Sequence, residues 1–174
     1  MSTSSSWVNQ IVGYGEEPPE SLLAHPMNPK IHPKTQQDAL AGSLNELGWI
    51  APVIVNRVTA HVLDGHARIG LAISRGEPSV PIAYVELSPE QENLAVAIYD
   101  PIGHMAATDR DQLSALLDEV STGDAAVQAM LDALARDQGI TPPDFAPVGI
   151  DEQGRLDQKA HVVCPECGHD FVPS

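Results

Sequence analysis

Apolar residues along this chain occur in two patterns. Short apolar runs rich in β-branched residues are typical of strands, and they predict strands at residues 8–14, 52–56, 61–63 and 80–86. A spacing of three to four residues is typical of helices that pack on a sheet, as at Leu40, Leu44 and Leu47 before Gly48. The mixture of the two patterns predicts an α/β (α+β) fold.

Polar residues mark where the helices should begin. Thr35 followed by Asp38 resembles a capping box, and Ser88 followed by Pro89 and Gln91 is a strong start signal. Because these signals stand directly before apolar-periodic stretches, each predicts the N-terminus of a helix.

The helix that starts near residue 88 has a predicted buried side. Helical spacing places Leu94, Ala97 and Ile98 on that apolar side. Glu92 lies in the first turn, and its only expected role is a favourable interaction of its negative charge with the positive end of the helix dipole. His25 falls in a predicted loop, and the sequence assigns it no partner.

Two further helices are expected to begin at Thr108 and Asp124, and together they predict a helical hairpin over residues 106–139. Two short helices joined by a glycine-containing turn could form a DNA-binding helix-turn-helix. However, the many acidic residues of this stretch leave almost no cation to face phosphates. An acidic hairpin that packs or contacts a partner protein is therefore the better prediction.

A distinctive motif joins the strand at 61–63 to the next helix. The chain passes through Asp64 and Gly65 into a first helical turn that carries His66 and Arg68. Helix N-termini have unpaired N–H groups and a positive dipole end, so this junction is a candidate phosphate site. The alternative is a tight turn that Asp64 caps, with a solvated arginine. In the first turn, Arg68 is expected to face solvent or ligand.

The order of several segments resembles the N-terminal domain of ParB proteins, which has the ParB/sulfiredoxin-like fold. The resemblance covers roughly residues 10–105 and is closest to the Asp-Gly-His-x-Arg form found in phages and mobile elements. The segments that carry it are Asn28-Pro29-Lys30-Ile31-His32-Pro33, residues 48–55, residues 61–72, Gly76, residues 80–82 and residues 87–92. It implies a small mixed sheet with flanking helices.

The resemblance also assigns candidate site residues. The family's phosphate motif matches Gly65, His66, Ala67 and Arg68, and its Asn-Pro-Arg segment matches Asn28, Pro29 and Lys30. Ala67 and Lys30 stand where the family has arginines. We expect a nucleotide, with Mg²⁺, or another phosphate-bearing ligand to bind Gly65, His66 and Arg68, with Asn28, Lys30 and His32 on the opposing wall.

Three functions remain open at this point. The resemblance favours a ligand-binding domain that serves DNA modification, partition or packaging in a phage or mobile element. One alternative is a ParB-like nuclease or nucleotide triphosphatase in which Asp64 and His66 organise a divalent metal and water as catalytic residues. Another is a non-catalytic adaptor for a DNA methyltransferase or packaging enzyme. Sulfinic-acid reduction is not expected, because His66 stands where sulfiredoxins have their catalytic cysteine.

The charge of the chain limits its partners. It has 9 Lys and Arg against 24 Asp and Glu, a net charge of −15. Proteins that bind DNA directly neutralise phosphates with Lys and Arg, so DNA is expected only indirectly, through a partner protein. The chain could also form a homodimer. Neither a membrane span nor a signal peptide is expected, which predicts a cytoplasmic protein.

The composition shifts to Pro, Asp, Gly and Gln from Thr141 onward. A Cys-Pro-Glu-Cys-Gly knuckle follows, and Cys164, Cys167, His161 and His169 are candidate zinc ligands. They could form one complete site, a half-site that a second chain completes, or a metal-free turn. The expected organisation is a disordered N-terminus at 1–9, the ParB-like domain at 10–105, the hairpin at 106–139, a linker at 140–160 and the zinc-knuckle-like tail at 161–174.

Overall fold

The fold was analysed in a computed structural model that describes residues 6–141, 162–163, 167 and 170–171. Its contacts divide the chain into two units, Met1–Thr141 and Pro142–Ser174. The second unit contains a short antiparallel pair of strands, β6 (Val162–Val163) and β7 (Asp170–Phe171). The expected linker lies almost entirely outside the described residues, as do positions 1–5 of the expected disordered N-terminus.

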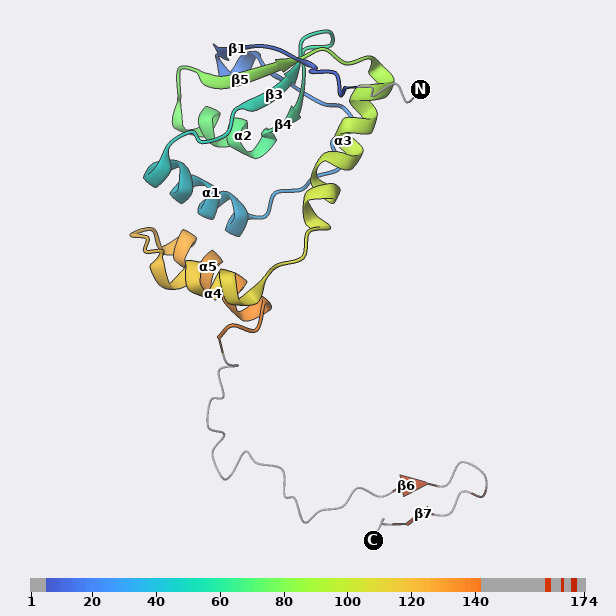
Figure 1. Cartoon of the computed structure of the whole chain (residues 1–174), viewed down its shortest axis with the longest axis vertical. Coiled ribbons are helices and arrows are strands. Elements are labelled where there is room, and N and C mark those ends of the chain that lie inside the picture. The colour runs from blue at the N-terminus through green and yellow to red at the C-terminus, as the bar shows by residue number, and fades with distance from the viewer. Residues whose placement is uncertain (1–5, 142–161, 164–166, 168–169, 172–174) are drawn as a thin grey trace. The chain divides into compact units, whose positions relative to one another are not determined.

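A mixed five-stranded sheet forms the centre of the first unit, with the strand order β1-β5-β3-β4-β2 (Figure 1). β1 pairs antiparallel with β5, β5 parallel with β3, β3 antiparallel with β4, and β4 parallel with β2. The strands are β1 (Ile11–Glu17), β2 (Leu23–Ala24), β3 (Val53–Asn56), β4 (His61–Asp64) and β5 (Val80–Val85). The expected α/β fold with a small mixed sheet is confirmed.

Five α-helices and one short 3₁₀ helix accompany the sheet. They are η1 (Pro19–Ser21), α1 (Lys34–Leu47), α2 (His66–Arg75), α3 (Pro89–His104), α4 (Arg110–Glu119) and α5 (Ala125–Asp137). Helix α2 packs against the sheet, and α1 lies between α2 and the α4–α5 pair (Figure 1). The chain leaves β5 into α3, which contacts β4.

The core lies between the sheet and α2. Its buried side chains come from the central strands and from one face of α2, namely Val53, Val55, Val62, Ile69, Ala72, Val80 and Ile82. Half-buried Leu22, Trp49 and Tyr84 pack against them. Burial of such aliphatic side chains contributes about 1.5–3 kcal/mol each. The central strands are therefore a rigid base for the loops that leave them.

The starts of two helices differ from the expectation. Helix α1 begins at Lys34, so Pro33 occupies the N-cap and Thr35 lies inside the first turn. Within residues 6–141 no side chain caps this helix, and Asp38 pairs with Lys34. Helix α4 is capped by Asp109 rather than Thr108, since the Asp109 carboxylate accepts bonds from two first-turn N–H groups at 3.1 and 3.0 Å. The expected caps at Ser88 and Asp124 are confirmed.

Glu46 attaches the turn between α4 and α5 to α1. Its carboxylate accepts hydrogen bonds from the Thr122 hydroxyl at 2.7 Å and from the N–H groups of Gly123 and Asp124 at 2.8 and 3.1 Å. These bonds hold the pKa of Glu46 below its usual value, with the Thr122 bond the largest cause. The two short helices are thus docked against α1.

Candidate functional site

A pocket of about 410 Å³ opens where α2 begins. Three segments of the chain line it. They are the loop before α1 with the first turns of that helix (Lys30, Ile31, His32, Gln36, Leu40), the β4–α2 junction (Asp64, Gly65, His66, Ala67, Arg68), and the end of α3 (Asp100, His104). The pocket therefore brings together five of the six residues expected to bind the phosphate, together with Asp64, which was expected in a catalytic role.

The sixth expected residue, Asn28, is not among the described residues that line this pocket. Its side-chain oxygen accepts a bond from the Lys30 N–H at 3.2 Å, and its own N–H donates to the His25 carbonyl at 3.0 Å. Asn28 therefore shapes the loop that presents Lys30.

Gly65 has a backbone that favours glycine. Its φ of 103° is in the left-handed region, and a Cβ there would stand 3.0 Å from the Val53 side chain. The first hydrogen bond of α2 runs from the Ile69 N–H to the Gly65 carbonyl at 3.0 Å, so the three preceding N–H groups are not bonded within the helix. Within residues 6–141 no side chain caps α2, so the expected cap by Asp64 is wrong.

Asp64 is instead paired with Arg68, one helical turn later. The distance from Arg68 Nη2 to Asp64 Oδ2 is 2.6 Å, and Arg68 Nη1 donates to the Ala51 carbonyl at 2.7 Å. Across the pocket, Lys30 forms an ion pair with Asp100 of α3. Each lysine or arginine that lines the pocket thus already has an acidic partner, and these two pairs are neutral together.

Two histidines present unpaired ring nitrogens. The Nε2 atoms of His32 and His66 are buried and have no hydrogen-bond partner among the residues described. Burial lowers the pKa of His66, and His32 and Lys30 add to this effect while Asp64 opposes it. His66 is therefore neutral at neutral pH. Buried polar atoms nearly always have a partner, so these two mark a place where a ligand or water would bind.

The sequence did not assign Gln36, Leu40, Asp100 or His104 to the pocket. Asp100 and His104 lie one turn apart on α3, and the Asp100 carbonyl accepts a hydrogen bond from His104 Nδ1 at 2.9 Å. Only the packing of α3 brings them to the start of α2. No local signal distinguishes them from exposed helix residues.

Helix α3 also differs from its expected orientation. Its predicted apolar side is exposed, with Leu94 at 57% and Ile98 at 39% of their full surface, whereas Glu92 is buried at 3%. The expectation that Glu92 serves only the helix dipole is therefore wrong. Glu92 and Asp100 lie on the same side of α3, about two turns apart, and both contact the loop that contains His25 and Lys30.

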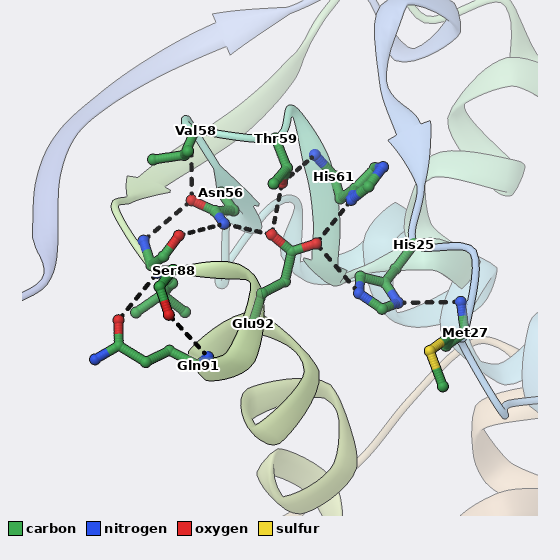
Figure 2. Close-up of polar contacts among 10 residues, drawn as sticks. His25, Met27, Asn56, Val58, Thr59, His61, Ser88, Gln91 and Glu92 are labelled. Carbon is green, nitrogen blue, oxygen red and sulfur yellow. Dashed lines mark hydrogen bonds and ion pairs between the residues drawn. The ribbon is translucent and has the colours of Figure 1, made fainter.

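Glu92 is the centre of a buried polar cluster (Figure 2). One carboxylate oxygen lies 2.7 Å from His61 Nδ1 and 3.2 Å from His25 Nε2. The other accepts bonds from the Thr59 hydroxyl at 2.6 Å and from the Asn56 amide. Burial opposes ionisation, but the bonds from Thr59, His61 and Asn56 together outweigh it, and the pKa of Glu92 lies below its usual value. His25, which the sequence left without a partner, is 4% exposed.

The expected zinc ligands lie in the second unit. Cys167 is exposed, and Cys164, His161 and His169 fall outside the described residues. Among the described residues, none of the helices combines the length and apolar character that a membrane span requires.

We compared the chain with family models, curated proteins and solved structures, and similarity was found among the solved structures. No family model matches the chain. No curated protein matches it either. It is similar to the C-terminally truncated chromosome-partitioning protein ParB from Caulobacter crescentus, complexed with CTP-gamma-S, at 22% identity and a TM-score of 0.48, over 71% of this chain and 79% of that one.

Two structures of a pNOB8-like ParB N-domain are also similar. They show 21% and 20% identity, each with a TM-score of 0.44, over 73% and 78% of this chain. The chain spans about half of their length, 47% and 49%.

Proposed function

We propose that the pocket at the start of α2 binds a nucleotide or another phosphate-bearing ligand, as in the ParB-like domain that the sequence resembles. The observation that carries this proposal is the uncapped first turn of α2, which opens into a pocket with unpaired Nε2 atoms of His32 and His66. Free N–H groups at a helix start are donors suited to phosphate oxygens. Such a domain would serve DNA modification, partition or packaging in a phage or mobile element.

The paired charges of the pocket favour a divalent cation as part of this ligand. A phosphate that approaches Lys30 or Arg68 also meets Asp100 or Asp64. Carboxylate oxygens and phosphate oxygens are both ligands that Mg²⁺ prefers. We therefore propose that Asp64 and Asp100 would hold Mg²⁺ while Lys30, Arg68 and the α2 amides contact the phosphates.

A catalytic variant of this proposal has one observation in its favour. His66 is neutral and has a free Nε2, so it could accept a proton from a water molecule. A nuclease or nucleotide triphosphatase with His66 and Asp64 in the catalytic roles is the second candidate. The exposed apolar side of α3 favours a third, an adaptor for a DNA methyltransferase or packaging enzyme.

The binding proposal is tested by thermal shift and calorimetry. The probes are ATP, GTP, CTP, UTP and inorganic tripolyphosphate, each with and without Mg²⁺. A ligand at a hundred times its Kd stabilises the fold by about 2.7 kcal/mol. We expect binding that Arg68→Ala weakens and Arg75→Ala does not, because Arg75 lies outside the pocket at the other end of α2. A wild-type chain that binds none of the probes at millimolar concentration contradicts the proposal.

We also propose that the tail binds Zn²⁺ through Cys164 and Cys167, with His161, His169 or a second chain completing the four ligands. Metal analysis of the purified protein and of Cys164→Ser tests this. One zinc per chain supports a complete site, half a zinc per chain in a dimer supports a shared one, and protein free of zinc after metal is supplied contradicts both.

A further inference from the structure

The three chain segments that line the candidate pocket are each preceded by a residue of the Glu92 cluster, which lies outside the pocket (Figure 2). His25 stands just before the loop that contains Lys30 and His32. His61 begins β4, the strand that leads into Gly65. Glu92 itself is in the first turn of α3, the helix that carries Asp100.

Hydrogen bonds continue from His25 to the pocket. The Met27 N–H donates to His25 Nδ1 at 3.1 Å, and the Asn28 N–H donates to the His25 carbonyl at 3.0 Å. The Asn28 side chain then accepts from the Lys30 N–H, and Lys30 pairs with Asp100. The loop is therefore attached to α3 at both ends, through Glu92 inside the protein and through Asp100 in the pocket.

The proton positions in this cluster follow from its donors. His25 Nδ1 accepts a bond from a backbone N–H, so a neutral His25 ring carries its proton on Nε2, which lies 3.2 Å from Glu92. His61, Thr59 and Asn56 donate hydrogen bonds to the two oxygens of Glu92, and His25 Nε2 adds a polar contact at 3.2 Å. Each of these groups can face the carboxylate with a proton.

A metal ion is the competing occupant, because the ligand atoms of His25, His61 and Glu92 all lie within 4.8 Å of one another. A histidine that binds a metal through Nε2 normally carries its proton on Nδ1 and donates it to an acceptor. Here His25 Nδ1 faces the Met27 N–H, which is a donor. The geometry thus favours protons over a metal at this cluster.

We propose that Glu92 is a positioning residue of the phosphate pocket: its carboxylate, through His25, His61, Asn56 and Thr59, holds the Lys30 loop, β4 and α3 in the arrangement that forms the pocket. This inference rests on the proposed function for the identity of the ligand. The arrangement itself can be measured without a ligand.

The matched variants are Glu92→Gln and Glu90→Gln. Both remove one negative charge from the first turn of α3, but Glu90 is exposed and its side chain accepts from the Ser88 hydroxyl at 2.8 Å, with no bond to the loop at 25–32 or to β4 among the described residues. A glutamine at 92 replaces one acceptor oxygen by an NH₂ group, so the donors on that oxygen lose their partner.

Amide hydrogen exchange gives the first readout. Glu92→Gln is expected to exchange at least about tenfold faster than Glu90→Gln at residues 25–32, at the start of β4 and in α3, with β5 unchanged, because local opening leaves the core strand protected. An equal increase in every element would reduce Glu92 to a general stabilising residue and overturn the proposal. Unchanged exchange at residues 25–32 would overturn it as well.

Tripolyphosphate with Mg²⁺ gives the second readout. Glu92→Gln is expected to bind it at least about tenfold more weakly than Glu90→Gln, a difference of about 1.4 kcal/mol. Equal affinities would overturn the positioning role. If the wild-type chain does not bind tripolyphosphate, the proposed function fails, and hydrogen exchange alone decides whether Glu92 holds the three segments.

Imidazole nitrogen NMR separates protons from metal. Zinc is titrated into a Cys164→Ser, Cys167→Ser chain, so that the tail cysteines do not compete. We expect an unprotonated Nδ1 at His25 and no change in the His25 and His61 signals with Zn²⁺. Stoichiometric zinc binding that shifts both histidines, and that Glu92→Gln abolishes, would overturn the hydrogen-bonded arrangement.

Discussion

Lys30 and Asp100 form an ion pair across the candidate pocket, joining the loop before α1 to the last turns of α3. A phosphate that binds Lys30 must compete with this carboxylate. The pair is part of the pocket before any ligand arrives, so its strength is subtracted from the affinity for phosphate.

Replacing Asp100 should therefore strengthen phosphate binding. We expect Asp100→Asn to raise the affinity for tripolyphosphate without Mg²⁺ by about two- to fivefold, since an ion pair this exposed contributes at most about 1 kcal/mol. With Mg²⁺ the gain should shrink, because a ligand for the metal is lost. Calorimetry measures both. Asp38→Asn, which removes the same charge from a pair on α1 outside the pocket, should change neither affinity.

The glycine at the start of α2 should not tolerate a side chain. Gly65→Ala is expected to lower the free energy of unfolding by about 1–3 kcal/mol, because of the positive φ and the contact with Val53. Gly70→Ala in the same helix should raise it by about 0.5–1 kcal/mol, since its Cβ would meet no atom within 4 Å among the described residues. Urea denaturation gives both values. Equal effects at the two glycines would contradict the strain at Gly65.

The lowered pKa of His66 predicts two effects of pH. Without ligand, folding favours neutral His66, so the stability it contributes is present above its usual pKa of 6.5 and is lost as pH falls through the lowered folded value. A bound phosphate favours the charged ring and raises the pKa again, so phosphate affinity should increase as pH falls from 8 to 6, by at most about tenfold per pH unit.

Calorimetry in buffers of different ionisation enthalpy measures the proton taken up on binding. His66→Gln should bind tripolyphosphate with no such uptake and a flatter pH profile. If His66→Gln takes up the same number of protons on binding tripolyphosphate, a group other than His66 is protonated.

A second carboxylate beside Glu92 should be strongly destabilising. The fully buried Asn56 amide donates to Glu92 and to the Leu87 carbonyl at 3.0 Å. Asn56→Asp replaces this donor by an acceptor, and we expect a loss of about 3 kcal/mol or more at pH 7. Repulsion raises the folded pKa of the new carboxyl group, so the loss should diminish as pH falls through that raised value.

Urea denaturation between pH 7 and pH 4 measures this trend. Asn45→Asp is the control, because Asn45 is exposed on α1 and its side-chain oxygen accepts from Arg75. A deficit in Asn56→Asp that does not depend on pH would indicate lost packing rather than repulsion.

Direct binding to duplex DNA is not expected. The net charge is −15, and Lys30, Lys34, Arg57 and Arg68 are each paired with an acidic residue. A gel shift with random duplex DNA at micromolar protein should show no retardation. Retardation that weakens with added salt would contradict this prediction.

The local parts of the fold could be predicted from the sequence. Runs of β-branched residues give β3, β4 and β5, and the Asp64-Gly65 junction gives the start of α2, because these features depend on neighbours in the chain. The resemblance to ParB N-terminal domains placed Lys30 and His32 opposite His66, and the three residues do line one pocket.

The face that α3 turns inward could not be predicted. Apolar periodicity assumes that the buried side of a helix is its apolar side, and it selected Leu94 and Ile98. The buried side instead carries Glu92, whose burial depends on four donors from β2–β4 and the loops beside them. Such donors are distant in sequence, so no local pattern reveals them.

Helix α1 separates two concave surfaces of the first unit. Gln36 and Leu40 line the candidate pocket and also the groove of about 740 Å³ between α1 and α5. A ligand that moves either side chain changes the shape of the groove as well. Thermodynamic linkage makes such coupling reciprocal. A molecule that binds the groove would change the affinity for phosphate by the same factor by which phosphate changes the affinity for that molecule. Two side chains one turn apart on α1 are therefore the shared boundary through which such coupling would act.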